Sequence, residues 1–323
     1  MRRRDFISLF GSVVTFALTA QAQEKGRTYR LGSLHHSPRN APHHIAFYEE
    51  LQRHGFIEGQ NLISDASGYG LRLEDLAEHA AEVVKGQVDV IIAAGDAPVR
   101  AAQQATKTIP ILANATDLLA QGFVRSLSKP EGNITGFSFL SNELDGKRQE
   151  ILMQAVPGAR RMAALIDSEY TKPRRAQALQ DAAHRYGVEL TLYTVSTRDE
   201  IAGAIERAKS SGAEALNVLA SALLYNNRQI IFDRTAVLRL PAIYEFASEG
   251  EEGGLIAYGP RLAQLYRDIF ARQCIKLLRG AKPTDLPVEQ PTQFYLVVNL
   301  KTAKALGLTV SESLLARVDT LIE

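Results

Sequence analysis

The stretch Val-Asp-Val-Ile-Ile-Ala-Ala-Gly-Asp-Ala-Pro, residues 88–98, decides the fold class. It begins as a nearly unbroken apolar run and stops at Gly95. Asp96 and Pro98 then follow, and these residue types favour the start of a helix. A strand that is apolar on both sides is typical of a parallel sheet covered by helices on both faces. The stretch therefore predicts a strand that runs into a helix, which is the basic unit of an α/β protein.

The same alternation continues on both sides of this stretch, up to residue 139. Apolar runs with β-branched residues predict the strands, and apolar residues at helical spacing predict the helices. The predicted strands are 29–34, 61–66, 88–94, 109–113 and 134–139, and the predicted helices are 43–54, 73–85 and 97–106.

A second series of the same kind fills the rest of the chain. Its predicted strands are 161–167, 188–195, 213–219, 242–246, 255–258 and 294–298. Its predicted helices are 143–156, 173–186, 198–210, 227–239, 261–278, 300–306 and 311–322. Pro283, Pro287 and Pro291 mark a stiff segment in which the chain crosses between units.

Two units of about five strands each predict two Rossmann-like lobes with parallel sheets, joined by a hinge. We expect lobe 1 to hold residues 23–139, with 260–285 returning to it. Lobe 2 is expected to hold residues 140–259, with 290–323 packing on it and on the hinge. Open parallel sheets bind ligands at the carboxyl ends of their strands, so the cleft between the lobes is the expected site.

Composition narrows the function classes. The chain has 323 residues, 37 basic against 36 acidic side chains and 46% hydrophobic residues, which indicates a folded protein. A formal charge of +1 argues against a nucleic-acid partner. The one cysteine excludes an internal disulfide framework and a multi-cysteine metal cluster.

The first 22 residues have the pattern of a secretory signal peptide. Three arginines at positions 2–4 precede an apolar stretch, 6–20, and Ala20-Gln21-Ala22 offers a cleavage site. The stretch is shorter and more polar than a membrane span, which is the alternative. The run Arg3-Arg4-Asp5-Phe6-Ile7 is also similar to a twin-arginine export signal. The sequence thus predicts a soluble protein outside the cytoplasm.

Catalytic signatures are missing from the sequence. It has no G-x-S-x-G elbow, no phosphate-binding P-loop, no H-E-x-x-H and no dinucleotide-binding glycine pattern. We therefore expect no cofactor, no catalytic residues and no enzymatic activity. An α/β enzyme that uses Asp167, Glu245 or a histidine as acid and base stays open as an alternative.

Four histidines, at positions 35, 36, 43 and 44, lie within ten residues. Such a group could bind zinc or copper, but the spacing matches no tight metal pattern. We therefore expect no metal site and interpret these residues as solvated loop and helix-cap histidines. His35 and His36 still follow the first strand, so either could face the cleft.

Short polar and aromatic residues follow several predicted strands in both units. They offer acceptors, hydroxyls and aromatic faces, which suit a small zwitterion or another polar organic molecule. At Gly95–Ala97, free N–H groups would bind a carboxylate, unless Asp96 caps its own helix. The candidate ligand-binding residues are His35, His36, Gly95, Asp96, Ala97, Asn114, Ala115, Asp117, Asp167, Ser168, Tyr170, Ser221, Ala222, Glu245, Phe246 and Tyr258.

Several stretches resemble one bacterial family along nearly the whole chain. They are residues 54–61 (HGFIEGQN), 89–95 (DVIIAAG), 108–111 (TIPI), 126–138 (SLSKPEGNITGFS), 253–260 (GGLIAYGP), 286–292 (LPVEQPT) and 299–307 (NLKTAKALG). The resemblance is to the substrate-binding proteins of ABC transporters, in the group with tryptophan- and tyrosine-binding members.

This resemblance implies a type I periplasmic-binding fold, a periplasmic monomer, and capture of an amino acid or related small molecule for a permease in the inner membrane. The chain departs from the family pattern at residues 64–70, at 117–119 and at Ser221-Ala222. A tryptophan ligand therefore does not follow from the resemblance. An exported ligand sensor for a receptor remains an alternative role.

Overall fold

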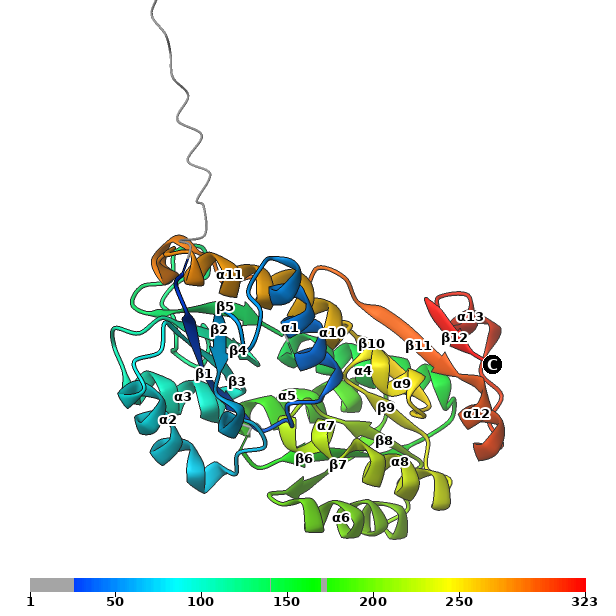
Figure 1. Cartoon of the computed structure of the whole chain (residues 1–323). Coiled ribbons are helices and arrows are strands. Elements are labelled where there is room, and N and C mark those ends of the chain that lie inside the picture. Colours follow the sequence, from blue (N-terminus) through cyan, green and yellow to red (C-terminus); the bar gives the residue numbers. More distant parts are fainter. Residues whose placement is uncertain (1–25, 140, 170–172) are drawn as a thin grey trace, which may run out of the picture.

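The computed structural model describes residues 26–139, 141–169 and 173–323. The predicted signal peptide and Tyr170 lie outside these ranges. Figure 1 shows two α/β bodies side by side, each built around its own sheet. The predicted α/β class with two sheets of mainly parallel strands is confirmed.

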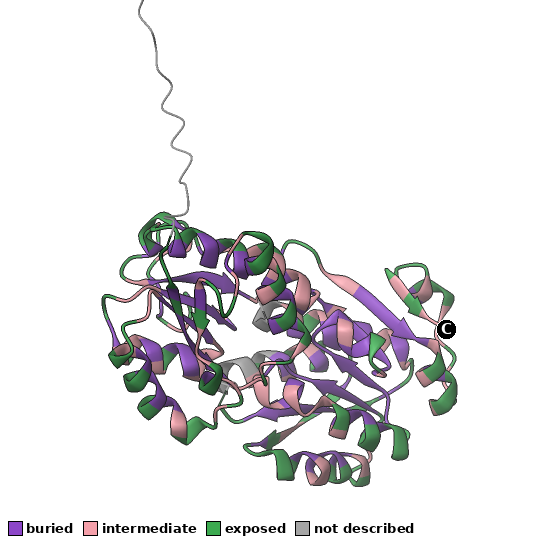
Figure 2. Ribbon diagram, viewed as in Figure 1, coloured by how far each residue is buried: buried purple, intermediate pink, exposed green. Residues whose placement is uncertain are grey.

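The first sheet is fully parallel, with the order β2-β1-β3-β4-β5. Its strands are β1 (Tyr29–His35), β2 (Leu62–Ser64), β3 (Val90–Ala94), β4 (Ile111–Ala115) and β5 (Ile134–Ser138). The run that decided the fold class is the central strand β3, and β3 through β5 are buried almost throughout. Figure 2 shows this pattern of buried strands beneath partly exposed helices.

Helices cover both faces of the first sheet. One face packs on α1 (Pro42–Arg53), α10 (Leu262–Leu265), the π-helix η3 (Tyr266–Ala271) and α11 (Arg272–Leu278). The other face packs on α2 (Leu76–Lys85) and α3 (Asp96–Ala105). In Figure 1 the orange segment with α11 lies over the first sheet, although in the chain it comes between β10 and β11 of the second sheet.

The second sheet has the order β12-β11-β10-β9-β8-β6-β7. Its strands are β6 (Arg161–Asp167), β7 (Glu189–Val195), β8 (Ala215–Val218), β9 (Ala242–Tyr244), β10 (Ile256–Gly259), β11 (Tyr295–Asn299) and β12 (Thr320–Ile322). All neighbours are parallel except β10 and β11. Its helices are α4 (Ser141–Ala155), α5 (Pro173–Arg185), α6 (Arg198–Ser210), α7 (Ala222–Asn226), α8 (Arg228–Val237), α9 (Ala247–Glu251), α12 (Leu300–Leu306) and α13 (Glu312–Leu315).

The predicted helix at residues 311–322 is wrong. Only Glu312–Leu315 is helical, and Thr320–Ile322 forms the edge strand β12. Asp319 explains the change, because its backbone N–H donates to the carbonyl of Leu296 at 2.9 Å and its carboxylate accepts the N–H of Leu296 at 2.7 Å. Pairing with β11 thus overrides the helical spacing of this segment. The second sheet has seven strands in place of about five.

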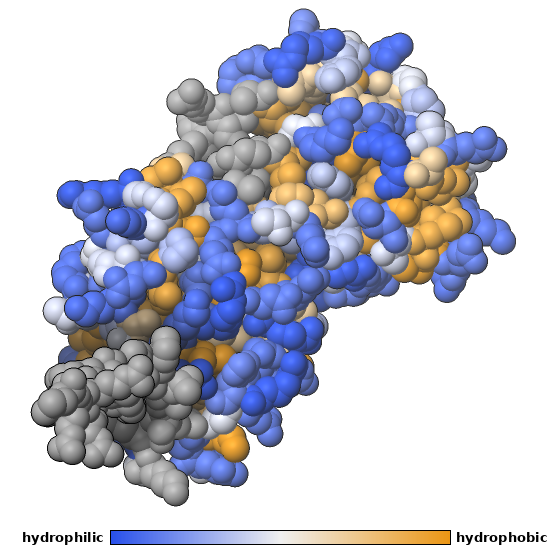
Figure 3. Space-filling model, turned by 90° about the horizontal axis from the view of Figure 1, so that it is seen from above, coloured by the Kyte–Doolittle hydropathy of each residue, from blue (hydrophilic) through white to orange (hydrophobic). Residues whose placement is uncertain are grey.

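The predicted single helix at 261–278 is divided by the π-helix η3, and the short helices α7 and α9 were not predicted. Short 3₁₀ turns also lie at Ala66–Gly68, Leu73–Asp75 and Pro283–Asp285. None of the helices within the described ranges is long and apolar enough to cross a membrane. Hydrophilic residues dominate the face seen in Figure 3, with apolar residues between them in separate patches.

Candidate ligand-binding site

A pocket lies where the carboxyl-end loops of the two sheets face each other. It encloses about 590 Å³ of space between atoms, part of it open to solvent. That volume is in the range of small-molecule sites in proteins. Eight of the predicted residues line it: His36, Gly95, Asn114, Ala115, Ser221, Ala222, Glu245 and Phe246.

The pocket also contains residues that the sequence analysis did not select. They are Ser37, His43, Ala94, Thr116, Phe139, Ala220, Tyr225, Leu262 and Tyr266. Thr116 and Phe139 follow β4 and β5, so the strand-end rule used for the other residues could have found them. Tyr225 and Tyr266 come from α7 and from the π-helix, whose positions no local sequence pattern reveals.

The remaining candidates within the described ranges do not line this pocket. Asp117 accepts the backbone N–H groups of Leu119 and Ala120 and so holds a turn. The hydroxyl of Ser168 bonds that of Ser196 at 2.9 Å on the surface. The other candidates outside the lining are His35, Asp96, Ala97, Asp167 and Tyr258.

Aromatic rings from both lobes form an arc along the pocket. Phe139 meets Phe246 with ring centroids 5.6 Å apart, and Phe246 meets Tyr225 at 5.2 Å. Tyr225 lies 6.1 Å from His43, which lies 4.6 Å from Tyr266. Rings in edge-to-face contact present both faces and edges, and these suit a planar apolar ligand group.

Asp96 does not cap its own helix, so that interpretation is wrong. The N-cap of α3 is Gly95, at φ +105°, a conformation that favours glycine. The Asp96 carboxylate instead accepts the Thr116 hydroxyl at 2.9 Å and the Gln121 amide at 2.7 Å. It thereby fixes the loop after β4 beside the start of α3. The N-cap residue Gly95 has no side chain that could cap α3, and its own N–H donates to the carbonyl of Asn114 at 2.9 Å.

Most polar side chains of the lining already have protein partners. The Asn114 amide donates to the Tyr266 hydroxyl at 2.7 Å, and the Ser221 hydroxyl accepts the N–H of Leu224 at 3.1 Å. At the pocket a hydrogen bond also joins the two lobes, because the Ser37 hydroxyl donates to the side-chain oxygen of Asn226 at 2.8 Å. The pocket is thus held in shape by bonds within and between its walls.

Three of the four histidines are buried, so their interpretation as solvated residues is wrong. His35, His43 and His44 are 0%, 3% and 1% exposed. His44 donates from Nδ1 to the carbonyl of Pro38 at 2.9 Å, and its Nε2 lies 3.3 Å from Nδ1 of His35. Since a neutral imidazole has one N–H and one lone pair, His44 Nε2 accepts and His35 Nδ1 donates.

Burial keeps these three rings neutral. It is the main reason that the pKa of His35 and that of His43 lie well below their usual value, and the neighbouring His44 adds to the effect. Burial also lowers the pKa of His44 to about 4, although the Pro38 carbonyl opposes the change. Among the described residues, no group of three or more His, Cys, Asp or Glu side chains could hold a metal ion.

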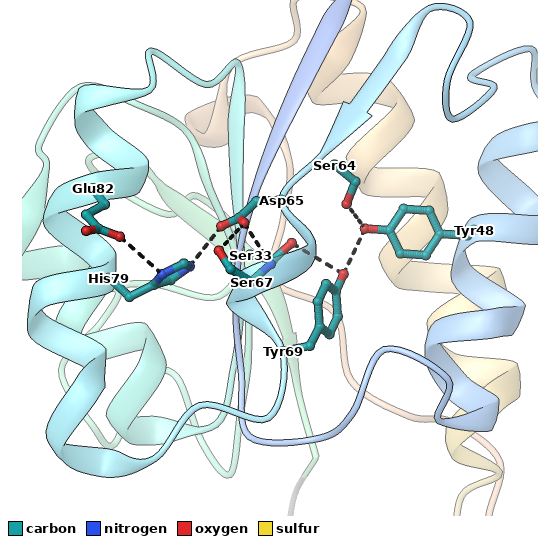
Figure 4. Close-up of polar contacts among 8 residues, drawn as sticks. All are labelled: Ser33, Tyr48, Ser64, Asp65, Ser67, Tyr69, His79 and Glu82. Carbon is teal, nitrogen blue, oxygen red and sulfur yellow. Dashed lines mark hydrogen bonds and ion pairs between the residues drawn. The ribbon is translucent and has the colours of Figure 1, made fainter.

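A network of hydrogen-bonded hydroxyl groups includes Tyr69, whose ring stacks on His35 (Figure 4 shows the hydroxyl groups). The Tyr48 hydroxyl on α1 meets that of Tyr69 at 2.7 Å and also bonds Ser64, while Ser33 donates to Tyr69 at 3.3 Å. The Tyr69 ring lies parallel to His35, with centroids 4.9 Å apart. The network therefore sets the position of His35 at the end of β1.

Next to this network, Asp65 accepts hydrogen bonds from Ser67 at 2.6 Å and from His79 Nε2 at 2.8 Å (Figure 4). Both donors bond the same carboxylate and no Ser67–His79 bond is present among the contacts drawn, so the group is not a nucleophile–base–acid chain. It links α2 to the segment after β2.

The lobe 2 rim is built around a buried cation. Arg148 is 0% exposed and pairs with Asp145 at 3.1 Å. It also donates to the carbonyls of Tyr258 at 2.9 Å and Glu245 at 3.5 Å. At the end of β6, burial raises the pKa of Asp167, although the hydrogen bond that its carboxylate accepts from the N–H of Glu169 opposes this change. The guanidinium thus ties the ends of β9 and β10 to α4.

Comparison with known proteins identifies the family. A model of the family described as ABC transporter substrate binding protein matches residues 41–322. The chain belongs to this family. The match covers most of both lobes, including α1 and the edge strand β12. The resemblance drawn from the sequence is thus confirmed.

Individual relatives agree with this assignment. A tyrosine-binding protein of Clostridioides difficile (strain R20291) is 27% identical over 266 residues, which is 81% of this chain and 75% of the relative. The structure of an ABC domain in complex with L-Trp from Streptococcus pneumonia has a TM-score of 0.79 at 21% identity and covers 91% of this chain and 100% of its own. The ligand-free, open structure of a substrate binding protein with adhesive properties from Clostridium difficile has a TM-score of 0.60 at 22% identity and covers 91% of this chain and 99% of its own.

Proposed function

We propose that this substrate-binding protein is the periplasmic component of an ABC import system and captures an aromatic amino acid, or a related aromatic carboxylate, between its lobes. The observation that carries the proposal is the arc of rings from Phe139 to Tyr266, to which both lobes contribute. The 27% identical relative named for tyrosine binding supports the ligand class.

The polar end of the pocket suits the zwitterionic part of such a ligand. Glu245, 7% exposed, is the acidic residue of the lining and would receive the ammonium group. The lining contains no Lys or Arg, so the carboxylate would be bound by hydroxyls and backbone N–H groups of the lining. These groups come from different lobes.

Contacts to both lobes give the ligand a higher affinity for the closed arrangement than for the open one. Only such a difference can shift the equilibrium between them, and a change from 1:99 to 99:1 requires about 5.5 kcal/mol. The proposed hinge consists of the crossings near residues 139, 259 and 285–290. A permease would recognise the closed pair of lobe surfaces, and the signal peptide at residues 1–22 would bring the monomer to the periplasm.

Binding of L-tryptophan, L-tyrosine and L-phenylalanine to the purified protein tests the proposal. The chain has no tryptophan, so the fluorescence of added L-tryptophan reports its binding directly, and the other two can be measured by competition. Tyr225→Ala should weaken binding at least about tenfold, because it removes a buried ring from the arc. The matched control is Tyr186→Ala, since Tyr186 is 60% exposed.

Analogues without the amino group test the role of Glu245. Glu245→Gln should weaken binding of L-tryptophan but leave that of indole-3-propionate unchanged. The bound compound should also be recovered intact by mass spectrometry, because a transport protein does not convert its ligand. Failure of all three amino acids to bind would refute the proposed ligand class.

A further inference from the structure

His43 differs from the other polar residues of the pocket in its hydrogen bonding. Among the described residues that line the pocket, it is the one whose side chain has a buried polar atom without a partner, namely Nδ1. Asn114, Ser221 and Ser37 all bond to other protein groups. A buried polar atom without a partner costs stability, so its retention at a pocket points to a partner that arrives with the ligand.

The surroundings of His43 place it at the aromatic end of the pocket. It lies in the first turn of α1, between Tyr266 of the same lobe and Tyr225 of the other lobe. The polar end, with Gly95 and Glu245, belongs to the carboxyl-end loops of β3 and β9. A ligand whose zwitterion lies at that end would bring its ring toward His43.

The protonation state of His43 permits a hydrogen bond of either direction. Burial, the neighbouring His44 and the cation Arg228 all lower the pKa of His43, so the ring is neutral near pH 7. A neutral Nδ1 either accepts from an indole N–H or a phenol O–H, or donates to a phenol oxygen. A phenylalanine ring offers neither group.

We propose that His43 is a specificity-determining residue, which selects ligands with a hydrogen-bonding group on the aromatic ring over ligands with a plain hydrocarbon ring. The inference rests on the proposed function and names a narrower ligand class within it: phenolic and indolic amino acids. A ligand without a hydrogen-bonding group on its ring leaves the buried polar atom of the site without a partner. Such a site therefore rejects that ligand far more strongly than an apolar pocket would.

The test compares L-tyrosine and L-phenylalanine on the wild type and on His43→Phe. The wild type should bind L-tyrosine at least about tenfold more tightly than L-phenylalanine. His43→Phe keeps a ring in the arc and removes the polar atom, so L-tyrosine affinity should fall about tenfold while L-phenylalanine affinity is kept or improved. His43→Gln, which restores a hydrogen-bonding group, should recover part of the preference.

A matched control is His54→Phe, the same exchange at an imidazole that is 48% exposed. It should retain the preference for L-tyrosine. The inference is overturned if the wild type binds L-phenylalanine as tightly as L-tyrosine, whether or not the variants fold. It is also overturned if His43→Phe leaves the ratio of the two affinities unchanged. Either result leaves the proposed function intact, whereas absence of binding by any aromatic amino acid refutes the function itself.

Discussion

The two sides of the pocket bury opposite kinds of ionisable groups. Lobe 1 buries His35, His43 and His44 as neutral rings, with burial lowering the pKa of each. Lobe 2 buries Arg148 as a cation paired with Asp145. It also buries Glu249, and burial raises the pKa of this carboxyl group to about 8. Lobe 1 thus keeps these three buried groups uncharged, while lobe 2 keeps a buried cation and pairs it with a carboxylate.

This difference separates two structural roles. All three guanidinium nitrogens of Arg148 bond protein groups, so the side chain holds strand ends in place. The histidine cluster leaves two buried nitrogens without partners, Nε2 of His35 and Nδ1 of His43. Among the described residues that line the pocket, the buried nitrogen without a partner lies on the lobe 1 side, at His43. Four substitutions test this contrast.

Arg148→Met should have the largest effect. It removes the cation and leaves the Asp145 carboxylate and the two carbonyls in the interior without it. Breaking a buried pair from one side costs about 3–5 kcal/mol. Chemical denaturation should show that loss in the free energy of unfolding, whereas Arg198→Met, at an exposed position on α6, should change it by less than about 0.5 kcal/mol. A loss below about 1 kcal/mol for Arg148→Met would mean that the cation is not what holds the rim.

Glu249→Gln should alter the pH dependence of stability on the alkaline side. Burial raises the pKa of Glu249 from 4.5 to about 8, so the folded state holds this proton over a range in which the unfolded state has lost it. Wild-type stability should then fall as pH rises through this range, by up to about 1.4 kcal/mol per pH unit. The glutamine can still accept the N–H of Phe246, which the carboxylate accepts at 2.8 Å, but it cannot ionise.

Unfolding measured from pH 6.5 to 8 isolates this effect from the histidines. The variant should show a flatter profile than the wild type there, and Glu78→Gln, at an exposed position on α2, should not. Identical slopes for the wild type and Glu249→Gln would contradict the assignment of a buried, protonated carboxyl to lobe 2.

His44→Gln should alter the pH dependence of stability on the acid side, where wild-type stability rises with pH. Burial lowers the pKa of His44 from 6.5 to about 4, so between these values the unfolded state binds a proton that the folded state refuses. The histidine contribution to stability is then lost as pH falls from 6.5 to 4, again by up to about 1.4 kcal/mol per unit. Removing the imidazole should reduce the slope of stability against pH between pH 4 and 6.5. This pH range is narrower than the one that Glu249 affects.

The matched control is His54→Gln just after α1, because its side chain is 48% exposed. Denaturation profiles at pH 4–6.5 should separate the two variants. If His54→Gln flattens the profile as much as His44→Gln does, burial is not the cause of the acid sensitivity.

Tyr266→Phe should have the smallest effect. The hydroxyl accepts the Asn114 amide at 2.7 Å inside the lobe 1 wall, and its removal leaves that amide without this acceptor. We expect a loss of about 1 kcal/mol in the free energy of unfolding and an unchanged ring arc. Thermal melting would measure the loss, and a gain in stability would show that Asn114 finds another partner.

Strand ends and helices also differ in how well their site residues could be predicted. At strand ends the prediction is local, because the carboxyl ends of parallel strands meet at one edge of a sheet, so Gly95, Asn114 and Glu245 were found. Tyr225, Tyr266 and His43 lie on helices, and whether a helical residue faces a cleft depends on how that helix packs. Asp96 was placed in the right loop with the wrong role, because its partner Thr116 lies 20 residues away.

The sequence by itself determined the alternation of strands and helices, the two-sheet α/β class and the family, since apolar periodicity and short motifs are local properties of the chain. Tertiary structure decided that Thr320–Ile322 is a strand, that three histidines are buried, and that rings from both lobes form one arc. The physical reason is that burial and pairing depend on neighbours distant in sequence. The sequence does not distinguish a solvated histidine from a buried one, because only the folded chain removes water from the imidazole and so lowers its pKa.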